Sequence, residues 1–449
     1  MSLLALTLTI IFVTSTQTKS ELEVEGLQVA QLENSPKVRV EVVPKEDTTV
    51  QAQVSSEGDE NGMVVSVCNE LCLKIHQASE MLENGTTPED LNARSETLSQ
   101  LMVSFNARAG VRNQEYFPHL AQDHIVLVVY SHRRADYLQI VLDALRLVEG
   151  INETLLIVSH DGYFPETVAA VQTVDFCQVA EVFVPYSPQV FRHTHPGSSL
   201  GDCPSRISLA EAQALGCKGD PDQYGNYREP KFVSLKHHWF WLMNYLWDGF
   251  PPLQGFEGYL AFIEEDHVLS RNAYLNLKAV AALRPELCPE ECLFLNIGPS
   301  IADGHLHQPG VVIDNPHNAG YAFDRKMWNK IRASASRFCE FDDYNWDFSL
   351  SFLLDQWHPN VSSIMPMTES IIHIGKCGMH FANDNCNPSE EVAAFFAEDH
   401  PFVDQRTPQV TRRELSRFKQ GFTGWGGWGD KRDQALCMWF TKMNDGPRR

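Results

Sequence analysis

The sequence has few basic residues for its size and lacks several common nucleotide and metal motifs. Its 36 Lys and Arg stand against 58 Asp and Glu, which gives a net charge of −22. A nucleic-acid-binding surface needs a basic footprint, so this balance excludes nucleic acid as an expected partner. No GxGxxG follows the first expected strand, which excludes the usual dinucleotide fingerprint, and the absence of HExxH disfavours a metallohydrolase.

The N-terminal segment is apolar but too short for an ordinary membrane helix. The stretch LLALTLTIIFVT lies well below the ~20 residues that a transmembrane helix needs. No basic segment precedes it, as one would in a typical signal peptide. We interpret residues 1–15 as a signal sequence or a short signal-anchor.

An acidic segment that is poor in aromatic residues follows. Residues 16–100 carry sixteen Asp or Glu and six Lys or Arg. Because such a composition buries little apolar surface, we expect residues 16–115 to form an acidic stem. We expect the folded domain to span residues 116–449. The 11 cysteines of the chain favour an oxidising compartment.

Continuous apolar runs mark the strands of the folded domain. HIVLVVY (124–130) and LLIVS (155–159) are typical of strands buried on both faces, and a helical pattern lies between them. This strand–helix–strand order predicts an α/β fold with a parallel sheet. A third strand, YLAFIEEDH, follows later in the chain. The three strands end in SHRR, SHDG and EEDH, and ligands of such sheets bind at the carboxyl ends of the strands.

The EEDH stretch concentrates negative charge at the edge of the expected core. Strand alternation places Glu264 and Asp266 on one face and Glu265 on the other. A divalent cation would neutralise this charge, and carboxylate with imidazole suits manganese better than calcium. Such a cation would in turn hold a diphosphate. The alternative is that the acids cap the helix expected at VLSRNAYLNLKAV, and both interpretations stay open at this point.

Three further stretches could carry chemistry, and each has an ordinary structural alternative. In DDYNWD (342–347) a carboxylate could deprotonate a hydroxyl beside a sugar-stacking Trp, or it could be a helix N-cap beside a core Trp. GWGGWGD (424–430) is typical of a mobile, sugar-contacting loop, or of a tail packed over the core. Lys236, His237 and His238 could meet phosphates or simply begin a helix.

Taken together, these motifs resemble the N-acetylglucosaminyltransferase II family, the α-1,6-mannosyl-glycoprotein enzymes of N-glycan maturation. DDYNWD joined to the other stretches is specific, whereas EEDH alone is not. The matching stretches keep the family's order from about residue 120 to 440, and they are VLVVYSHRR, IVSHDG, YREPKF, KHHW, FIEEDH, HNAGYA, FCEFDDYNWDFSL, HIGKCGMH and GGWGDKRDQALC.

The resemblance implies a GT-A-like glycosyltransferase fold, with a Rossmann-type nucleotide-sugar half and an acceptor-binding half. It implies UDP-GlcNAc as donor, Mn²⁺ as cofactor and an N-glycan on a glycoprotein as acceptor. The implied reaction is an inverting transfer of GlcNAc to O2 of the α-1,6-arm mannose, which forms a β-1,2 linkage. The implied location is the Golgi membrane, in single-pass type II topology, with residues 116–449 as the lumenal catalytic domain.

The resemblance also assigns roles to individual residues. Asp347 would be the general base, and Asp266 and His373 would bind the metal. The residues implied in nucleotide-sugar binding are Tyr130, Ser131, His132, Arg133, Arg134, Asp161, Ser234, Leu235, Lys236, His237 and His238. The residues implied in acceptor binding are Asp222, Asn318, Tyr344 and Trp346.

Most of the cysteines match family disulfides. The implied pairs are Cys203–Cys217, Cys288–Cys292, Cys339–Cys437 and Cys377–Cys386. A further family bridge is missing as a pair, because Ser334 and Trp357 stand where its cysteines would be. Cys68, Cys72 and Cys177 stay unassigned, and the stem cysteines could cross-link two chains into a homodimer.

Two kinds of alternative remain. One is a related transferase that acts on the other mannose arm, or a paralogue with a changed acceptor. The other is a catalytically silent, glycan-binding protein of the same fold. A silent protein would typically have lost the base or a metal ligand, and Asp266, Asp347 and His373 are all present.

Overall fold

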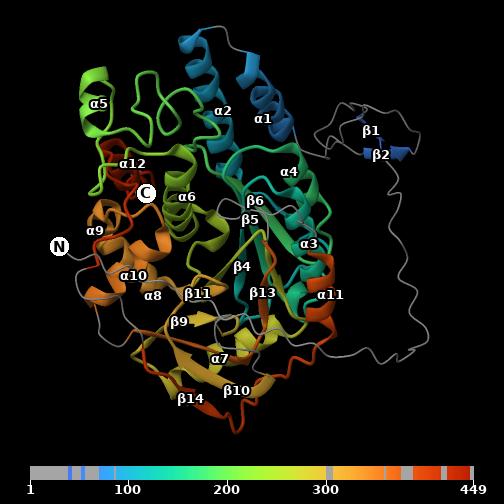
Figure 1. Ribbon diagram of the computed structural model, residues 1–449. Coiled ribbons are helices and arrows are strands. Elements are labelled where there is room, and N and C mark those ends of the chain that lie inside the picture. Colours follow the sequence, from blue (N-terminus) through green and yellow to red (C-terminus); the bar gives the residue numbers. More distant parts are fainter. Residues whose placement is uncertain are drawn as a thin grey trace, which may run out of the picture.

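The structure is a computed structural model, and its described part contains one large mixed sheet with helices on both faces (Figure 1). The described residues are 39–42, 52–55, 70–84, 87–299, 307–357, 361–375, 388–415 and 422–444. No helix among them is both long enough and apolar enough to cross a bilayer. Residues 1–15, the expected signal or anchor segment, lie outside the described part.

Parallel strands form the centre of the large sheet. β4 pairs in parallel with both β5 and β7, and β5 pairs in parallel with β6. The helix α3 connects β4 to β5, as the sequence predicts. The elements are β4 (Val126–Ser131), α3 (Ala135–Leu145), β5 (Leu155–His160), α4 (Pro165–Gln172), β6 (Gln178–Phe183) and β7 (Tyr259–Glu264). The predicted α/β fold is therefore confirmed.

Further strands extend the sheet on both sides, in the order β14-β10-β12-β9-β11-β7-β4-β5-β6-β3. They are β3 (Val111–Arg112), β9 (Cys292–Asn296), β10 (His307–Asp314), β11 (Tyr321–Asp324), β12 (Ser362–Thr368) and β14 (Val410–Arg412). A separate antiparallel pair joins β8 (His267–Leu269) to β13 (Ile371–His373), and another joins β1 (Arg39–Val42) to β2 (Ala52–Ser55).

Alternating side chains of β4 supply two cores, one on each face of the sheet. Leu127 and Val129 pack with α3 and α7, whereas Val126, Val128 and Tyr130 pack with the helices on the other face. The helices on the first face include α7 (Ala273–Leu287) and α11 (Ser389–Ala397). Those on the second face are α6 (Pro230–Asn244), α8 (Arg325–Ala333), α9 (Ala335–Glu340), α10 (Trp346–Trp357) and α12 (Lys431–Phe440). A sheet covered on both faces explains why its strands read as unbroken apolar runs.

The expected stem boundary at residue 116 needs correction. The helices α1 (Glu70–Met81) and α2 (Pro88–Arg108) lie beside β6, the strand next to the edge strand β3 (Figure 1). Leu98 and Met102 of α2 are buried in a small core with Phe183 of β6. The side-chain amide of Asn106 donates to the carbonyl of Phe183 and accepts from its N–H. The folded domain therefore includes these helices, because their apolar face is buried against it.

The structure contains three of the four expected disulfides, namely Cys203–Cys217, Cys288–Cys292 and Cys339–Cys437. The expected pair Cys377–Cys386 lies outside the described residues. Trp357 Nε1 donates a hydrogen bond of 3.1 Å to Ser334 Oγ, so these two residues are in contact where the family bridge was expected. Cys72 is also disulfide-bonded, and Cys177 is free and buried. A bonded Cys72 is not available to cross-link two copies of the chain.

Candidate active site

The carboxyl ends of three parallel strands meet at one edge of the sheet. The register pairs Tyr130 of β4 with Ser159 of β5 on one side and with Glu264 of β7 on the other. The polar stretches SHRR, SHDG and EEDH therefore lie together, as their sequence positions predict. The site has two parts at this edge, one around Asp161 and one around Asp266.

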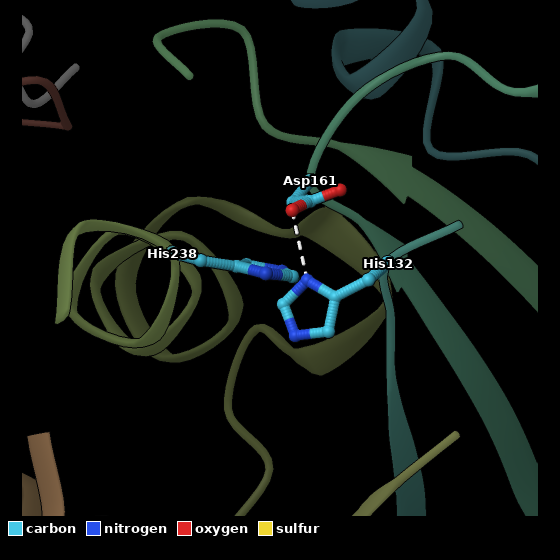
Figure 2. A group of neighbouring side chains, drawn as sticks. All are labelled: His132, Asp161 and His238. Atoms are coloured by element: carbon cyan, nitrogen blue, oxygen red, sulfur yellow. Dashed lines mark hydrogen bonds and ion pairs between the residues drawn. The ribbon is translucent and has the colours of Figure 1, made fainter. Parts of the chain in front are cut away.

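Around Asp161, two histidines and a glutamine surround the carboxylate. Figure 2 shows the imidazole of His132 pointing at Asp161, with His238 of α6 beside it. His132 Nδ1 lies 2.8 Å from Asp161 Oδ2, and Gln189 Nε2 donates to the same oxygen at 2.9 Å. His238 Nε2 lies 2.8 Å from the hydroxyl of Ser159. Gln189 was not expected from the sequence, because it lies in a loop without a recognisable motif.

Charge is divided unequally between the two histidines. Burial opposes a charge on His132, but Asp161 outweighs it and raises the pKa of His132 to about 9. Burial lowers the pKa of His238 to about 3. A protonated imidazole has no lone pair for a metal, so this group fits an anionic or hydrogen-bonding ligand better than a cation. The arrangement fits the nucleotide role expected for His132, Asp161 and His238.

A buried carboxylate that the sequence analysis placed wrongly organises the loop after β4. Glu265 accepts hydrogen bonds from the backbone N–H of His132 at 2.7 Å and from Arg134 Nε at 2.6 Å. Arg134 also forms an ion pair of 2.8 Å with Asp266. β7 ends at Glu264, so strand alternation does not extend to the next two residues. Arg134 is therefore held by two carboxylates, whereas Arg133 is exposed.

The second part of the site gathers a carboxylate and two imidazoles. The β8–β13 pair sets His267 opposite His373. Ligand atoms of Asp266, His267 and His373 all lie within 4.8 Å of one another. His373 Nε2 lies 3.2 Å from Asp266 Oδ2. Asp266 Oδ1 is buried and has no hydrogen-bond partner among the described residues.

These residues fit a divalent metal ion. Oδ2 of Asp266 is paired with Arg134 and His373, but Oδ1 has no partner among the described residues, and a buried polar atom without a partner is costly. A Cβ at position 375 would overlap Asp266 Oδ2 and lie 2.9 Å from His373 Nε2. Gly375 therefore leaves the space beside these ligand atoms open. The backbone N–H of Glu264 donates to Nδ1 of His267, which fixes that ring. The alternative that the acids cap a helix is wrong, since α7 begins at Ala273.

Asp347 lies at the start of α10, next to a stack of aromatic rings. The ring of Trp346 is parallel to that of Trp239, with an interplanar angle of 1° and centroids 5.2 Å apart. Burial, and then the negative charge of Asp343, raise the pKa of Asp347 to about 6, against hydrogen bonding from the Phe348 N–H. A carboxylate with a pKa near neutrality is suited to act as a general base.

The residues from Ser234 to His238 lie on different faces of α6. The ammonium of Lys236 is fully buried and donates to the carbonyls of Phe341 and Asp343 at 2.9 and 3.0 Å. His237 contacts the carbonyl of Asp433 and the ring of Trp428. The structure therefore shows protein contacts for Lys236 and His237, and their nucleotide role stays a prediction. A helix turns by about 100° per residue, so five consecutive residues point in different directions.

The remaining members of this stretch lie in different surroundings. Ser234 is buried and donates to the carbonyl of Lys231, while Leu235 is half-buried. Ser234 and His238 lie one helical turn apart and share a face of α6. Of the loop residues expected at the nucleotide, Tyr130 and Ser131 are buried at the end of β4.

The glycine-rich loop at 424–430 is pinned, because two carboxylates accept hydrogen bonds from its backbone N–H groups. Asp222 Oδ2 accepts from the N–H of Gly427 at 2.7 Å, and Asp343 Oδ2 accepts from that of Trp425 at 2.9 Å. Asp222 also accepts from the N–H groups of Tyr224 and Asn226. All these donors are protein groups, so Asp222 holds the loop in place, and its expected acceptor contact stays a prediction.

Tyr344, another expected acceptor residue, contacts the same loop. The N–H of Tyr344 donates to the carbonyl of Gly426 at 3.2 Å, and its ring lies 5.1 Å from that of Phe232. Asn318 is exposed in the turn before β11. Trp425 exposes 63% of its surface on the pinned loop, next to the ring of Phe348. It is a sugar-binding candidate that the sequence analysis did not name individually.

Comparisons with known proteins agree with this arrangement. The sequence pattern of N-acetylglucosaminyltransferase II (MGAT2) matches residues 99–437. An alpha-1,6-mannosyl-glycoprotein 2-beta-N-acetylglucosaminyltransferase from Arabidopsis thaliana is 42% identical over 339 residues, which cover 74% of this chain and 78% of that protein. The Homo sapiens protein of the same name is 33% identical over 359 residues, which cover 76% of this chain and 79% of that protein.

Solved structures give only weak matches. A mannosyltransferase from Pyrobaculum calidifontis in complex with GDP-Man and Mn²⁺ is 10% identical, with a TM-score of 0.27 over 66% of this chain and 65% of that chain. A glucosyl-3-phosphoglycerate synthase from Mycobacterium tuberculosis is 13% identical, with a TM-score of 0.25 over 62% of this chain and 77% of that chain. Both scores are too low to support an argument about this chain.

Proposed function

The chain belongs to the N-acetylglucosaminyltransferase II family, and we propose that it transfers GlcNAc from UDP-GlcNAc to O2 of the α-1,6-arm mannose of an N-glycan. The product carries a β-1,2 linkage, and the fold is of the GT-A type. The observation that carries the proposal is Asp347, a carboxylate with a pKa of about 6 beside the aromatic ring of Trp346. A silent glycan-binding protein would not need a base with this property.

Asp347 acts on the acceptor side of the reaction. Its carboxylate takes the proton of the mannose O2 hydroxyl as that oxygen attacks C1 of GlcNAc. The bond between C1 and the phosphate oxygen breaks, and UDP leaves with the electron pair. Attack opposite the leaving group inverts C1 from α to β. The flat ring of Trp346 and the exposed ring of Trp425 offer stacking surfaces for the sugars of the acceptor.

Residues at the ends of β4 and β5 bind the donor. Asp161, fixed by His132 and Gln189, accepts a hydrogen bond from the uracil base. His132 is positively charged at neutral pH and Arg133 is exposed, so both favour the negative diphosphate. Asp266 and His373 would hold Mn²⁺, which supplies positive charge for the departing diphosphate. Arg134 and Glu265 fix the position of Asp266.

The cellular location follows from the same family assignment. We propose that the catalytic domain lies in the Golgi lumen and that residues 1–15 anchor the chain in type II topology. The disulfides of the folded domain support an oxidising compartment. A tagged full-length chain in permeabilised cells tests this, since a lumenal C-terminus is protected from protease until the Golgi membrane is opened.

A transfer assay tests the proposed activity. The full chain, UDP-GlcNAc and Mn²⁺ are incubated with a biantennary N-glycan that already carries GlcNAc on its α-1,3 arm. We expect one added GlcNAc, and NMR of the product should show a β-1,2 linkage on the α-1,6-arm mannose. Addition to the other arm would indicate the related transferase. UDP binding without any transfer would indicate an altered acceptor or a protein that only binds glycans.

A further inference from the structure

A chain of three hydrogen-bonded aromatic residues links the donor side of the site to its acceptor side. The hydroxyl of Tyr130, at the end of β4, lies 2.5 Å from the hydroxyl of Tyr321 in β11. Nε1 of Trp239, in α6, donates to the same Tyr321 hydroxyl at 2.6 Å. Tyr321 exposes 2% of its surface and Trp239 exposes 1%, so their exposure gives no sign of a role in the site.

The chemistry of the indole fixes the direction of one of these hydrogen bonds. An indole N–H can only donate, so the Tyr321 oxygen must accept from Trp239. The Tyr321 hydroxyl contacts no other hydrogen-bonding group than Trp239 and Tyr130 among the described residues. Either hydroxyl of the Tyr130–Tyr321 pair could donate in their shared hydrogen bond. The Tyr321 hydroxyl therefore joins Trp239 to Tyr130, which lies at the end of β4 where the sugar donor is proposed to bind.

Trp239, at the other end of this hydrogen-bonded series, supports the acceptor side of the site. Trp346 lies flat on Trp239, and its ring centroid is 5.1 Å from that of Tyr321. Asp347 follows Trp346 directly, so the same two buried rings set the position of the stacking surface and of the first turn of α10. An offset stack of two aromatic rings stabilises their contact by more than the burial of their surface area alone would.

We propose that Tyr321 and Trp239 are positioning residues for the transfer reaction, with Tyr321 acting on the donor through Tyr130 and Trp239 acting on the acceptor through Trp346. The inference rests on the proposed function, because it assigns the two ends to donor and acceptor. It adds two residues that touch neither substrate. It also explains why a tryptophan and a tyrosine, rather than two phenylalanines, occupy this part of the core.

The two residues can be separated by conservative variants. Tyr321→Phe removes one hydroxyl and keeps the ring against Trp346. We expect the KM for UDP-GlcNAc and the Kd for UDP to rise about 3- to 10-fold, which corresponds to one neutral hydrogen bond, with little change in the acceptor KM. Trp239→Phe removes both the N–H and the larger ring, so we expect the acceptor KM to rise as well, by a similar factor.

Matched controls measure the effect of the same changes elsewhere in the core. Tyr245→Phe removes a buried hydroxyl that donates to the carbonyl of Asn106, and Trp328→Phe removes a buried indole that donates to Asp248. We expect these controls to lower Tm as much as the test variants but to leave both KM values unchanged. Test variants that lower Tm with both KM values unchanged would overturn the proposal, as would a Tyr321→Phe variant that changes only the acceptor KM.

The binding measurement separates this inference from the proposed function. If the wild-type chain binds UDP but transfers no GlcNAc, the proposed function fails, and the Kd for UDP still tests the link from Tyr321 to Tyr130. An unchanged Kd in Tyr321→Phe then overturns that link. If the wild-type chain transfers GlcNAc and the variants match their controls, only the positioning role is overturned.

Discussion

Replacing Asp347 by Asn tests the base most directly. The exchange keeps the size of the side chain, and the amide oxygen can still accept from the N–H of Phe348. It removes the only group at the start of α10 that can take the proton of the acceptor hydroxyl. General-base catalysis contributes roughly 10²- to 10⁴-fold, so we expect kcat to fall by about 10³ with the Kd for UDP unchanged.

The same residue predicts the pH dependence of the wild-type enzyme. Burial disfavours the charged form, so the pKa of Asp347 is raised to about 6, and the active carboxylate is present above this pH. Below pH 6 we expect kcat/KM to fall about tenfold per pH unit. The negative charge of Asp343 also raises this pKa, so Asp343→Asn should move this acid limb to lower pH.

Stability provides an independent readout of the same carboxylate. A group whose pKa is higher in the folded state destabilises the fold wherever the unfolded chain is already ionised. The cost of Asp347 therefore begins above its ordinary pKa of 3.8 and is complete above pH 6. A shift of this size corresponds to at most about 3 kcal/mol, and partial exposure reduces it. Asp347→Asn should therefore raise Tm most at pH 7.5, by about half as much at pH 5, and leave it nearly unchanged below about pH 3.5. A wild-type profile without an acid limb near pH 6, or an Asn variant with normal kcat, would refute the assignment.

Three other substitutions test separate parts of the structure. Glu265→Gln loses the charge that holds Arg134 beside Asp266, so we expect Mn²⁺ to bind about 10- to 100-fold more weakly in a metal titration, whereas an unchanged affinity would contradict this role. Asn106→Leu leaves the N–H and carbonyl of Phe183 without partners, and chemical unfolding should show a loss of roughly 1–3 kcal/mol. Trp425→Ala should raise the acceptor KM several-fold at an unchanged donor KM, and an equal change in both would argue for a general defect in the pinned loop.

Strands buried on both faces were predicted well, because an unbroken apolar run can be recognised without knowing which other segments it contacts. β4 and β5 are unbroken apolar runs with a helical pattern between them, and this local order specifies a parallel pair. Helix α2 carries no such signal. Its buried face consists mainly of Leu98, Met102 and Asn106, and the partner strand residue Phe183 is 77 positions away from Asn106. Composition therefore placed α2 in the stem.

The contacts within the site that the sequence did not predict have a common physical cause, because motif letters do not show the direction of a side chain. Lys236 and His238 are two residues apart, yet Lys236 donates to the carbonyl of Asp343 in the core, whereas His238 contacts Ser159 at the end of β5. Glu265 follows the last residue of β7, where strand alternation no longer applies. Asp222 holds a glycine loop that is 205 positions away in sequence. In each case the deciding contact is long-range.

The balance of charge at the sheet edge favours the proposed binding of a cation there. Arg134 is shared between Glu265 and Asp266, and Glu265 is further compensated by the N–H of His132. Asp266 still has one oxygen without a partner among the described residues. The proposed diphosphate would bring more negative charge to this edge, where His132 is a positive group. A metal held by Asp266 and His373 would supply further positive charge against this repulsion, so chelation should weaken UDP binding as well as transfer.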